Sequence, residues 1–385
     1  MFSKMRSSLK IFTWLGIPVH VHWTFVFIFA YAFWLGHSNN LGLTNTLWIT
    51  GFFTALFACV LLHEYGHALA ARYYGVPTQD IILTPIGGVA RLEYMPEKPV
   101  QEFVVAIAGP LVNVVLAAGL YAAGWLLFSE EHWLVFRWLL EQNLLFGQGG
   151  SEELGFELGP LASGGLFYLS ALVAANVALV IFNLIPAFPM DGGRIFRAML
   201  AARMSRVRAT QVAAWLGQAI AALFIVIGLW QSAFTLVLVG FFVFTLARAE
   251  NRNVRMDAVL RHFKAADIVR TSYTRLSVTD GMETPIHLMQ VGLERHFLVF
   301  DSLEHLVGVL EEKRILEALK RRDYAAPVEK YLTAQVQVVS QEVRLEYVYY
   351  LIRHQGLHLV AVVSQGQLVG VIDDIGLSQF LKMHR

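Results

Sequence analysis

The chain has 385 residues, of which 56% are hydrophobic and only 15% are charged. Because soluble domains carry about 25% charged residues, this composition argues against a wholly soluble protein and predicts that part of the chain lies in a bilayer. The net charge of +1 excludes a general electrostatic attraction to nucleic acid, and the single cysteine, Cys59, excludes a disulfide framework within the chain.

Long apolar runs dominate the chain as far as Arg248, and charged residues become frequent after it. Because a helix needs roughly 20 residues to cross a bilayer, these runs predict about six membrane-spanning helices. No small-residue cleavage site follows the basic segment Met1–Lys10, so the first run is expected to remain as a span rather than act as a signal peptide. The expected spans cover residues 18–36, 46–73, 102–128, 165–188, 209–230 and 232–249.

Lysine and arginine residues gather in the loops on one side of these spans. Under the positive-inside rule they predict a multi-pass protein of the cell membrane with both termini in the cytoplasm. The opposite side has a long acidic, glycine-rich loop over residues 129–164, with a short interfacial helix expected around Trp133–Leu140. Glu102, at the start of the third span, is expected at the level of the lipid headgroups. The orientation rests on Lys4, Arg6, Lys10, Arg72, Arg91, Lys98, Arg194, Arg197, Arg203, Arg206, Arg208, Arg248, Arg252 and Arg255.

The second span contains the sequence His63-Glu64-Tyr65-Gly66-His67. On a helix the two histidines lie one turn apart on the same face, where their imidazoles can hold one Zn²⁺ ion. Glu64 lies on the same turn and is placed to take a proton from water as a general base. Ionisable residues inside a span are costly and usually mark a functional site; the alternative is a polar cluster that packs helices together.

A catalytic zinc site needs a third protein ligand as well as an open position. Asp191 is the candidate, because the fourth span is expected to bring it to the same depth as the two histidines. The surrounding segment Asn183–Arg194 contains two prolines and two glycines that break the helix. Broken backbone at membrane depth persists only where protein or a water-filled cavity surrounds it, which is the environment of a buried site.

These two segments resemble those of the site-2 protease family of intramembrane zinc metalloproteases. The first matches the family's HExxH motif and the second its Asn-Pro/Pro-Asp-Gly segment, and the resemblance covers most of residues 10–200. It implies one zinc ion with three protein ligands and one general base: His63, His67 and Asp191 as ligands and Glu64 as the base.

The resemblance gives further expectations around the metal. The segment Ala108–Asn113 is similar to the family's third-span motif, and Gly16–Trp23 is similar to the start of its first span. The family implies that Asn113 and Asn183 assist near the substrate or the oxyanion.

Residues Asp80–Glu93 directly follow the second span, and Gly87-Gly88 lies between their two apolar runs, which predicts a β-hairpin. A peptide bond inside a transmembrane helix becomes accessible only when the substrate unwinds into an extended strand. The free edge of the hairpin is placed to pair with that strand, with Gly87 and Gly88 near the substrate, and the family resemblance supports such a membrane-associated sheet. The alternative is a plain connecting loop.

The residues after Arg248 contain an internal repeat, because the segment His296–Leu310 recurs as His358–Ile372. Each copy predicts two strands followed by a helix, Ile315–Lys320 in the first and Leu377–Met383 in the second. This half resembles a tandem pair of CBS domains. The expected domains are 1–250 for the transmembrane metalloprotease, 251–263 for a linker, 264–323 for the first CBS repeat and 324–385 for the second.

CBS pairs often bind adenine nucleotides and commonly associate, so the resemblance implies a nucleotide and a homodimer as partners. The aspartate that would hold the ribose is replaced here by Arg314 and Gly376, which leaves a ligand-free dimerisation or docking module as an equal alternative. The histidines of this half lack ligand spacing and are expected to be structural: His287, His296, His305, His354 and His358.

The predicted fold class is a polytopic α-helical membrane protein with a membrane-associated β-hairpin, followed by a soluble α/β tandem CBS (Bateman) module. The expected function is zinc-dependent hydrolysis of a peptide bond in or near the transmembrane segment of a membrane-tethered regulator, for example an anti-sigma or pro-sigma factor. No nucleic-acid partner is expected. The alternatives are a CBS-regulated transporter, which gives no reason for the HExxH motif, and a catalytically silent scaffold, which predicts the loss of Glu64 or of a ligand.

Overall fold

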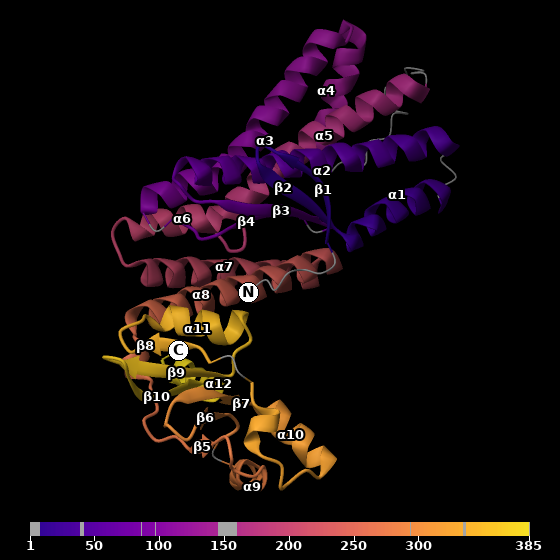
Figure 1. Ribbon diagram of the computed structural model, residues 1–385. Coiled ribbons are helices and arrows are strands. Elements are labelled where there is room, and N and C mark those ends of the chain that lie inside the picture. Colours follow the sequence, from indigo (N-terminus) through magenta and orange to yellow (C-terminus); the bar gives the residue numbers. More distant parts are fainter. Residues whose placement is uncertain are drawn as a thin grey trace. The chain divides into compact units, whose positions relative to one another are not determined.

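The computed structural model describes residues 8–38, 42–85, 87–96, 98–144, 160–292, 294–333 and 336–384. The chain divides into two compact units, Met1–Asn251 and Arg252–Arg385. Helix α8 (Phe234–His262) begins in the first unit and continues past the boundary (Figure 1). Most of the residues expected as a linker, 251–263, are therefore helical.

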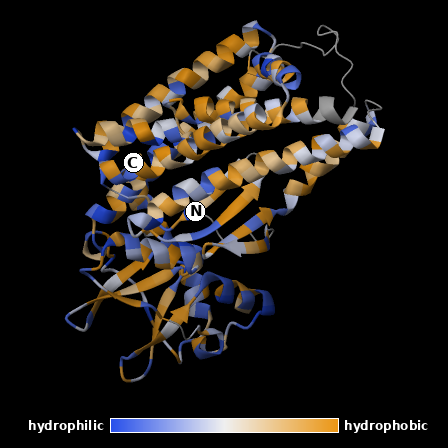
Figure 2. Cartoon of the chain, turned by 90° about the horizontal axis from the view of Figure 1, so that it is seen from above, coloured by the Kyte–Doolittle hydropathy of each residue, from blue (hydrophilic) through white to orange (hydrophobic). Residues whose placement is uncertain are grey.

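Five helices among the described residues are long and apolar enough to cross a membrane, and they correspond to the second to sixth expected spans. Their hydrophobic colouring is evident in Figure 2. Many of their exposed side chains are large and apolar, among them Trp215, Trp230 and Phe234, as expected for surfaces that contact lipid. The five are α2 (Gly42–Tyr73), α3 (Pro99–Leu127), Gly165–Leu184 within α5 (Pro160–Leu184), α7 (Arg206–Trp230) and α8.

The first expected span, residues 18–36, is not one continuous helix. Its first part forms strand β2 (Ile17–His22) and a 3-10 turn, η1 (Trp23–Phe25), and the helix α1 covers only Val26–Ser38. The reason lies in the local pattern, since apolar and polar residues alternate from Ile17 to His22 with the period of a strand. Hydropathy alone does not distinguish such a strand from the start of a span.

A four-stranded sheet in the order β1-β2-β3-β4 packs against α2. Strand β1 (Ser8–Trp14) pairs antiparallel with β2, β2 pairs parallel with β3 (Thr78–Thr84), and β3 pairs antiparallel with β4 (Gly87–Leu92). The parallel pair is possible because α1 and α2 form the crossover between its strands. Ile17 and Ile81 of the sheet pack on Tyr65 of α2, which brings the sheet to the turn that carries the HExxH motif.

Helix α3 is packed against α2, α5 and α6 (Figure 1). Helix α5 ends at Leu184, and α6 (Asp191–Ala201) begins at Asp191, so the chain breaks within the segment Asn183–Arg194 as expected. The loop expected on the outer side contains a helix, α4 (Glu130–Leu144), which covers the residues expected to be helical, Trp133–Leu140. The remainder of that loop, residues 145–159, lies outside the described residues.

The second unit consists of two similar halves, each with a three-stranded sheet and two helices. The sequence predicted the last two strands and the last helix of each half, but not the first strand, whose three residues are too few to give a periodic pattern. The first half has η3 (Ala265–Asp267), β5 (Arg275–Ser277), α9 (Glu283–Val291), β6 (Phe297–Phe300), β7 (Leu306–Leu310) and α10 (Glu312–Arg321). The second half has η4 (Val328–Tyr331), β8 (Val338–Ser340), α11 (Leu345–His354), β9 (Leu359–Ser364), β10 (Gln367–Asp373) and α12 (Asp374–Met383).

Candidate metal centre

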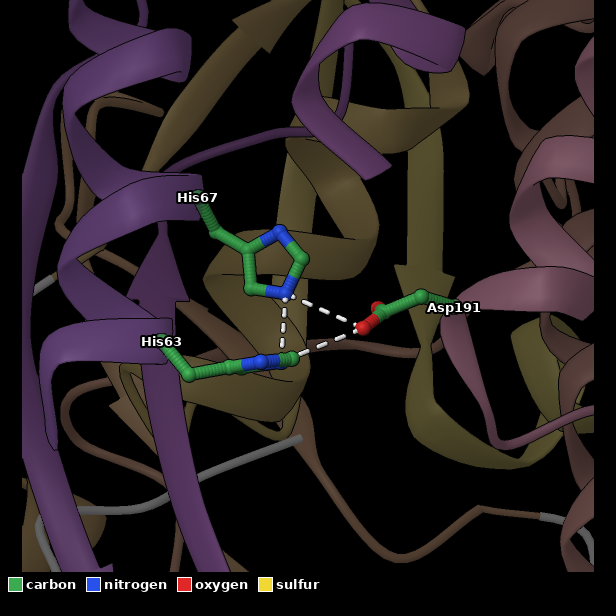
Figure 3. Close-up of side chains that lie close together, drawn as sticks. All are labelled: His63, His67 and Asp191. Atoms are coloured by element: carbon green, nitrogen blue, oxygen red, sulfur yellow. Dashed lines mark hydrogen bonds and ion pairs between the residues drawn. The ribbon is translucent and has the colours of Figure 1, made fainter. Parts of the chain in front are cut away.

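Two histidines of α2 and the first residue of α6 come together in the first unit. Nε2 of His63 lies 3.1 Å from Nε2 of His67 and 3.3 Å from Oδ2 of Asp191, and Nε2 of His67 lies 3.1 Å from the same oxygen. All three side chains are buried. Figure 3 shows the two rings and the carboxylate pointing toward one another, so the three residues form a single cluster of possible metal ligands.

Helix α3 orients both imidazole rings of this cluster. Nδ1 of His63 lies 2.5 Å from Oδ1 of Asn113, and Nδ1 of His67 lies 2.7 Å from the backbone oxygen of Val105. Because both partners are acceptors, each Nδ1 carries a proton and donates it. In a neutral imidazole the other nitrogen then has a free lone pair, and both of these lone pairs belong to the Nε2 atoms that lie beside Asp191.

A second amide keeps Asn113 in this orientation. Nδ2 of Asn113 donates to Oδ1 of Asn176 at 2.7 Å, and Nδ2 of Asn176 donates to the backbone oxygen of Leu172 at 2.8 Å. The same Nδ2 lies 3.5 Å from Sγ of Cys59, a small buried residue, as the sequence suggested. A chain of hydrogen bonds therefore runs from the ring of His63 through α3 to α5.

The three ligand atoms have the spacing that a zinc ion requires. Two lone pairs and a carboxylate oxygen at these distances repel one another unless a cation lies between them. Tetrahedral zinc with bonds of about 2.0–2.1 Å places its ligand atoms about 3.3 Å apart, close to the 3.1–3.3 Å found here. Two imidazoles and a carboxylate are also a donor set of catalytic zinc sites, so the residues fit the metal.

Helix α3 approaches the cluster closely because residue 109 is glycine. A Cβ atom there would lie 2.2 Å from Nε2 of His67 and 2.7 Å from Nε2 of His63, far inside van der Waals contact. Gly109 belongs to the segment Ala108–Asn113, which resembles a family motif. The close approach of α3 to the two imidazole rings explains why that motif has glycine at this position.

Glu64 lies on the same turn of α2 and contacts the sheet. Its Oε2 accepts a hydrogen bond from the backbone N–H of Ala90 in β4 at 2.8 Å. A Cβ atom on Gly88 would lie only 2.6 Å from Cγ of Glu64, so glycine allows the strand to pass beside this carboxylate. The edge strand of the sheet thus runs past the candidate general base.

Asn113, Asn183 and Gly87, which the sequence predicted near the substrate, each have a different environment. Asn113 contacts His63 and is part of the support of the cluster. Asn183 is half-buried in the last turn of α5. Gly87 begins β4 with a φ of +142°, a conformation that favours glycine.

Three contributors to this site were missed by the sequence analysis. Val105 and Ala90 act through backbone atoms, which leave no signal in the sequence. Asn176 is a buried polar residue in the apolar segment Gly165–Leu184, and that unusual position was a usable signal.

A second group of titratable residues lies in the second unit, where the sequence predicted unrelated histidines. The rings of His296 and His358 stack with centroids 4.9 Å apart and an angle of 4° between their planes, and Asp374 lies 3.5 Å from Nδ1 of His358. Ligand spacing along the chain could not reveal this pair, because its members come from equivalent positions in the two halves. Burial, together with the neighbouring His358, lowers the pKa of His296.

The geometry of this pair favours packing between the two halves over a metal site. Parallel rings do not direct their in-plane lone pairs toward a common point. Nδ1 of His296 also accepts the backbone N–H of Glu312 at 3.3 Å, so its Nε2 carries the proton when the ring is neutral.

Known proteins resemble this chain over almost its whole length. Residues 51–227 match the description of peptidase family M50. A zinc metalloprotease of Methanocaldococcus jannaschii is 30% identical over 370 residues, which cover 96% of this chain and 94% of that protein. The chain belongs to peptidase family M50. It is a zinc metalloendopeptidase of a membrane, as the sequence predicted.

Solved structures resemble each part of this M50 peptidase. The site-2 protease from Methanocaldococcus jannaschii is 33% identical and covers 63% of this chain and 95% of that chain, with a TM-score of 0.42. The CBS domain of a membrane protein from Sphaerobacter thermophilus is 20% identical and covers 34% of this chain and 96% of that chain, with a TM-score of 0.28. The expected peptidase family is confirmed by the family match and by the zinc metalloprotease of Methanocaldococcus jannaschii, and the C-terminal CBS pair remains a prediction.

Proposed function

We propose that His63, His67 and Asp191 hold the catalytic zinc ion and that Glu64 is the general base in peptide hydrolysis. The observation that carries this assignment is the mutual distance of 3.1–3.3 Å between three buried ligand atoms. When bound, zinc lowers the pKa of a water molecule to roughly 7 and polarises a scissile carbonyl. A transporter or a silent scaffold would not account for a three-ligand cluster beside a carboxylate.

The residues of the chain supply the proton transfer and the orientation. Glu64 accepts the proton of the attacking water and delivers it to the leaving amine, and the N–H of Ala90 holds its carboxylate in place. Asn113 keeps His63 in the tautomer whose Nε2 lone pair is available. A substrate role for Asn113 requires it to leave this partner, so we favour Asn183 as the residue near the oxyanion.

The proposed substrate is a single-span membrane protein that presents an extended segment to β4. A helical peptide bond is shielded by the hydrogen bonds and side chains of its own helix, so the segment must unwind before hydrolysis. Strand β4 is an edge of the sheet and passes beside Glu64, and an extended segment that pairs with it would pass the base and the metal. Gly87 and Gly88 leave room on this edge. A membrane-tethered regulator such as an anti-sigma or pro-sigma factor has the required form.

The second unit is proposed to modulate this activity as a cytoplasmic docking or dimerisation module. The distribution of lysine and arginine supports the cytoplasmic placement of both termini. Adenylate binding is less well supported, because Arg314 pairs with Glu317 and the N–H of Gly376 donates to Asp373 in a helix cap. Neither position offers a free carboxylate to a ribose.

The assignment is tested with full-length wild type and Glu64→Gln purified in detergent. Bound zinc is measured, and each protein is incubated with single-span membrane proteins. We expect one zinc ion per chain in both proteins and a cleavage rate at least about 100-fold lower in Glu64→Gln, the lower end for loss of a general base. Asp191→Ala should lose zinc as well as activity. A wild type without zinc, or equal cleavage by wild type and Glu64→Gln, would overturn the assignment.

A further inference from the structure

A buried ion-pair cluster joins α6 to α3 and α8. The side chain of Arg197 on α6 is 2% exposed, and that of Glu102 on α3 is 1% exposed. The guanidinium donates to Oε1 of Glu102 at 2.6 Å and to Oε1 of Glu250 on α8 at 2.8 Å, and it lies 5.0 Å from the centre of the Phe188 ring. The sequence predicts Glu102 at the level of the headgroups and Arg197 among the loop charges, and it did not indicate that protein buries both side chains.

Such a cluster has demanding geometry. Removing an arginine and a carboxylate from water is costly unless each charge is paired and hydrogen-bonded. The planar fork of Arg197 contacts two carboxylates at once, which the compact ammonium of lysine cannot do in the same geometry. A buried ion pair does not by itself show that it stabilises the fold. The position of this pair relative to the metal ligands indicates a more specific role.

Both buried partners lie on elements that position a metal-binding side chain. Arg197 belongs to the same short helix as Asp191, which is the first residue of that helix. Glu102 lies one turn before Val105, whose backbone oxygen accepts the Nδ1 proton of His67. The pair between Arg197 and Glu102 therefore ties the helix that carries the carboxylate ligand to the helix that orients an imidazole ligand.

We propose that Arg197 is a positioning residue of the zinc site, which holds α6 against α3 so that Asp191 stays within ligand distance of His67. This inference rests on the ligand assignment proposed above. Helix α6 has only 11 residues and follows the irregular segment 185–190, so contacts along the helix have to determine where its first residue lies. Ligand distances in a metal site tolerate only about 0.2 Å, and a small shift of α6 is therefore sufficient to weaken the site.

Glu250 gives the same arginine a partner of a different kind. Its side chain is 35% exposed, in contrast to the fully buried Glu102. Neutralising Glu250 leaves the pair between Arg197 and Glu102 intact and leaves no unpaired buried carboxylate. Glu250→Gln should therefore weaken zinc binding, as Arg197→Lys should, but by a smaller factor.

The test compares Arg197→Lys, which keeps the charge but not the fork, with Arg203→Lys, a matched control at an exposed arginine just after α6. Full-length proteins in detergent are titrated with zinc in competition with a chelator. They are then loaded with Co²⁺, whose visible absorption reports the ligand geometry. We expect Arg197→Lys to bind zinc about 10-fold more weakly, the lower end for loss of an outer-sphere contact, with an altered cobalt spectrum. Arg203→Lys should match the wild type in both measurements.

A purely structural role would give a different result. If Arg197→Lys has a lower melting temperature but the zinc affinity and cobalt spectrum of the wild type, the positioning role is refuted. Should Arg197→Lys fail to fold, Glu102→Gln takes its place, because it removes the charge at the other end of the same pair. Wild-type zinc affinity in Glu102→Gln would refute the positioning role equally. A wild type that binds no zinc would instead overturn the ligand assignment, so the two failures are distinguishable.

Discussion

Replacing Gly109 with alanine tests how closely α3 approaches the metal centre. The added Cβ would lie 2.2 Å from Nε2 of His67 and 2.7 Å from Nε2 of His63. Non-bonded heavy atoms rest about 3.5 Å apart, so the rings or the helix must move by roughly 1 Å. Because ligand distances in a metal site tolerate about 0.2 Å, this displacement is several times larger than the site can absorb.

The expected size of the effect follows from the two rings that the substitution displaces. Loss of one outer-sphere contact to a ligand weakens metal binding about 10–100-fold. Gly109→Ala pushes on the ligand atoms themselves, so we expect at least about 100-fold weaker zinc binding, or about 2.8 kcal/mol at about 1.4 kcal/mol per factor of ten. Gly119→Ala on the same helix is the matched control, because its Cβ would meet no atom within 4 Å. Both substitutions gain the same helix propensity of about 1 kcal/mol.

The assay is competition with a chromogenic zinc chelator on purified full-length protein, followed by cleavage of a single-span substrate. Gly109→Ala should lose zinc affinity and activity together, whereas Gly119→Ala should keep both. If the two variants bind zinc equally well, the rings can move aside at no cost. The inference that glycine is required for the approach of α3 would then be wrong.

Two further changes probe the support of the zinc site and the packing of the second unit. Asn113→Ala removes the acceptor for Nδ1 of His63 and should weaken zinc binding about 10–100-fold in the same titration; wild-type affinity would show that the ring does not need this bond. In the second unit, burial and His358 hold the pKa of His296 below its usual value, so the unfolded chain takes up that proton first as the pH falls below about 6.5. Stability should therefore decrease from about pH 6.5 downward until the folded pKa is passed. The measurement is hydrogen exchange of β6 in the full-length protein at pH 7.5 and 5.5, corrected for intrinsic rates. Wild type should lose protection at the lower pH, and His296→Asn should not. An equal loss in the variant would show that other titrating groups cause the pH dependence.

The ligand candidates could be found in the sequence because zinc chemistry uses few side-chain types at restricted spacings. The spacing of His63 and His67 on a helix and the broken helix before Asp191 both leave a local pattern. The structure brings the same three residues together across the first unit. The internal repeat of the second unit was visible for a similar reason, since each copy keeps the order of its apolar residues.

Features that depend on pairing between distant segments left no such pattern. A hydropathy window treats the strand Ile17–His22 and the helix that follows it as one apolar run. The burial of Arg197 depends on Glu102 and Glu250 lying on two other helices, which nothing near position 197 indicates. The roles of Val105 and Ala90 depend only on backbone atoms, and any residue type with the same backbone path would present them.

Placed at membrane depth, as the sequence predicts, the edge strand β4 has a thermodynamic consequence. In water, the unpaired main-chain groups of an edge strand are hydrated, and a peptide that pairs with them gains little. In apolar surroundings each unsatisfied group costs several kcal/mol. Among the described residues, Glu64 satisfies one such group on β4, the backbone N–H of Ala90. A substrate segment that unwinds in lipid has the same deficit along its own backbone. Pairing the two would relieve both deficits at once, so the bilayer itself would favour capture of an extended segment at this edge, whatever side chains the segment carries.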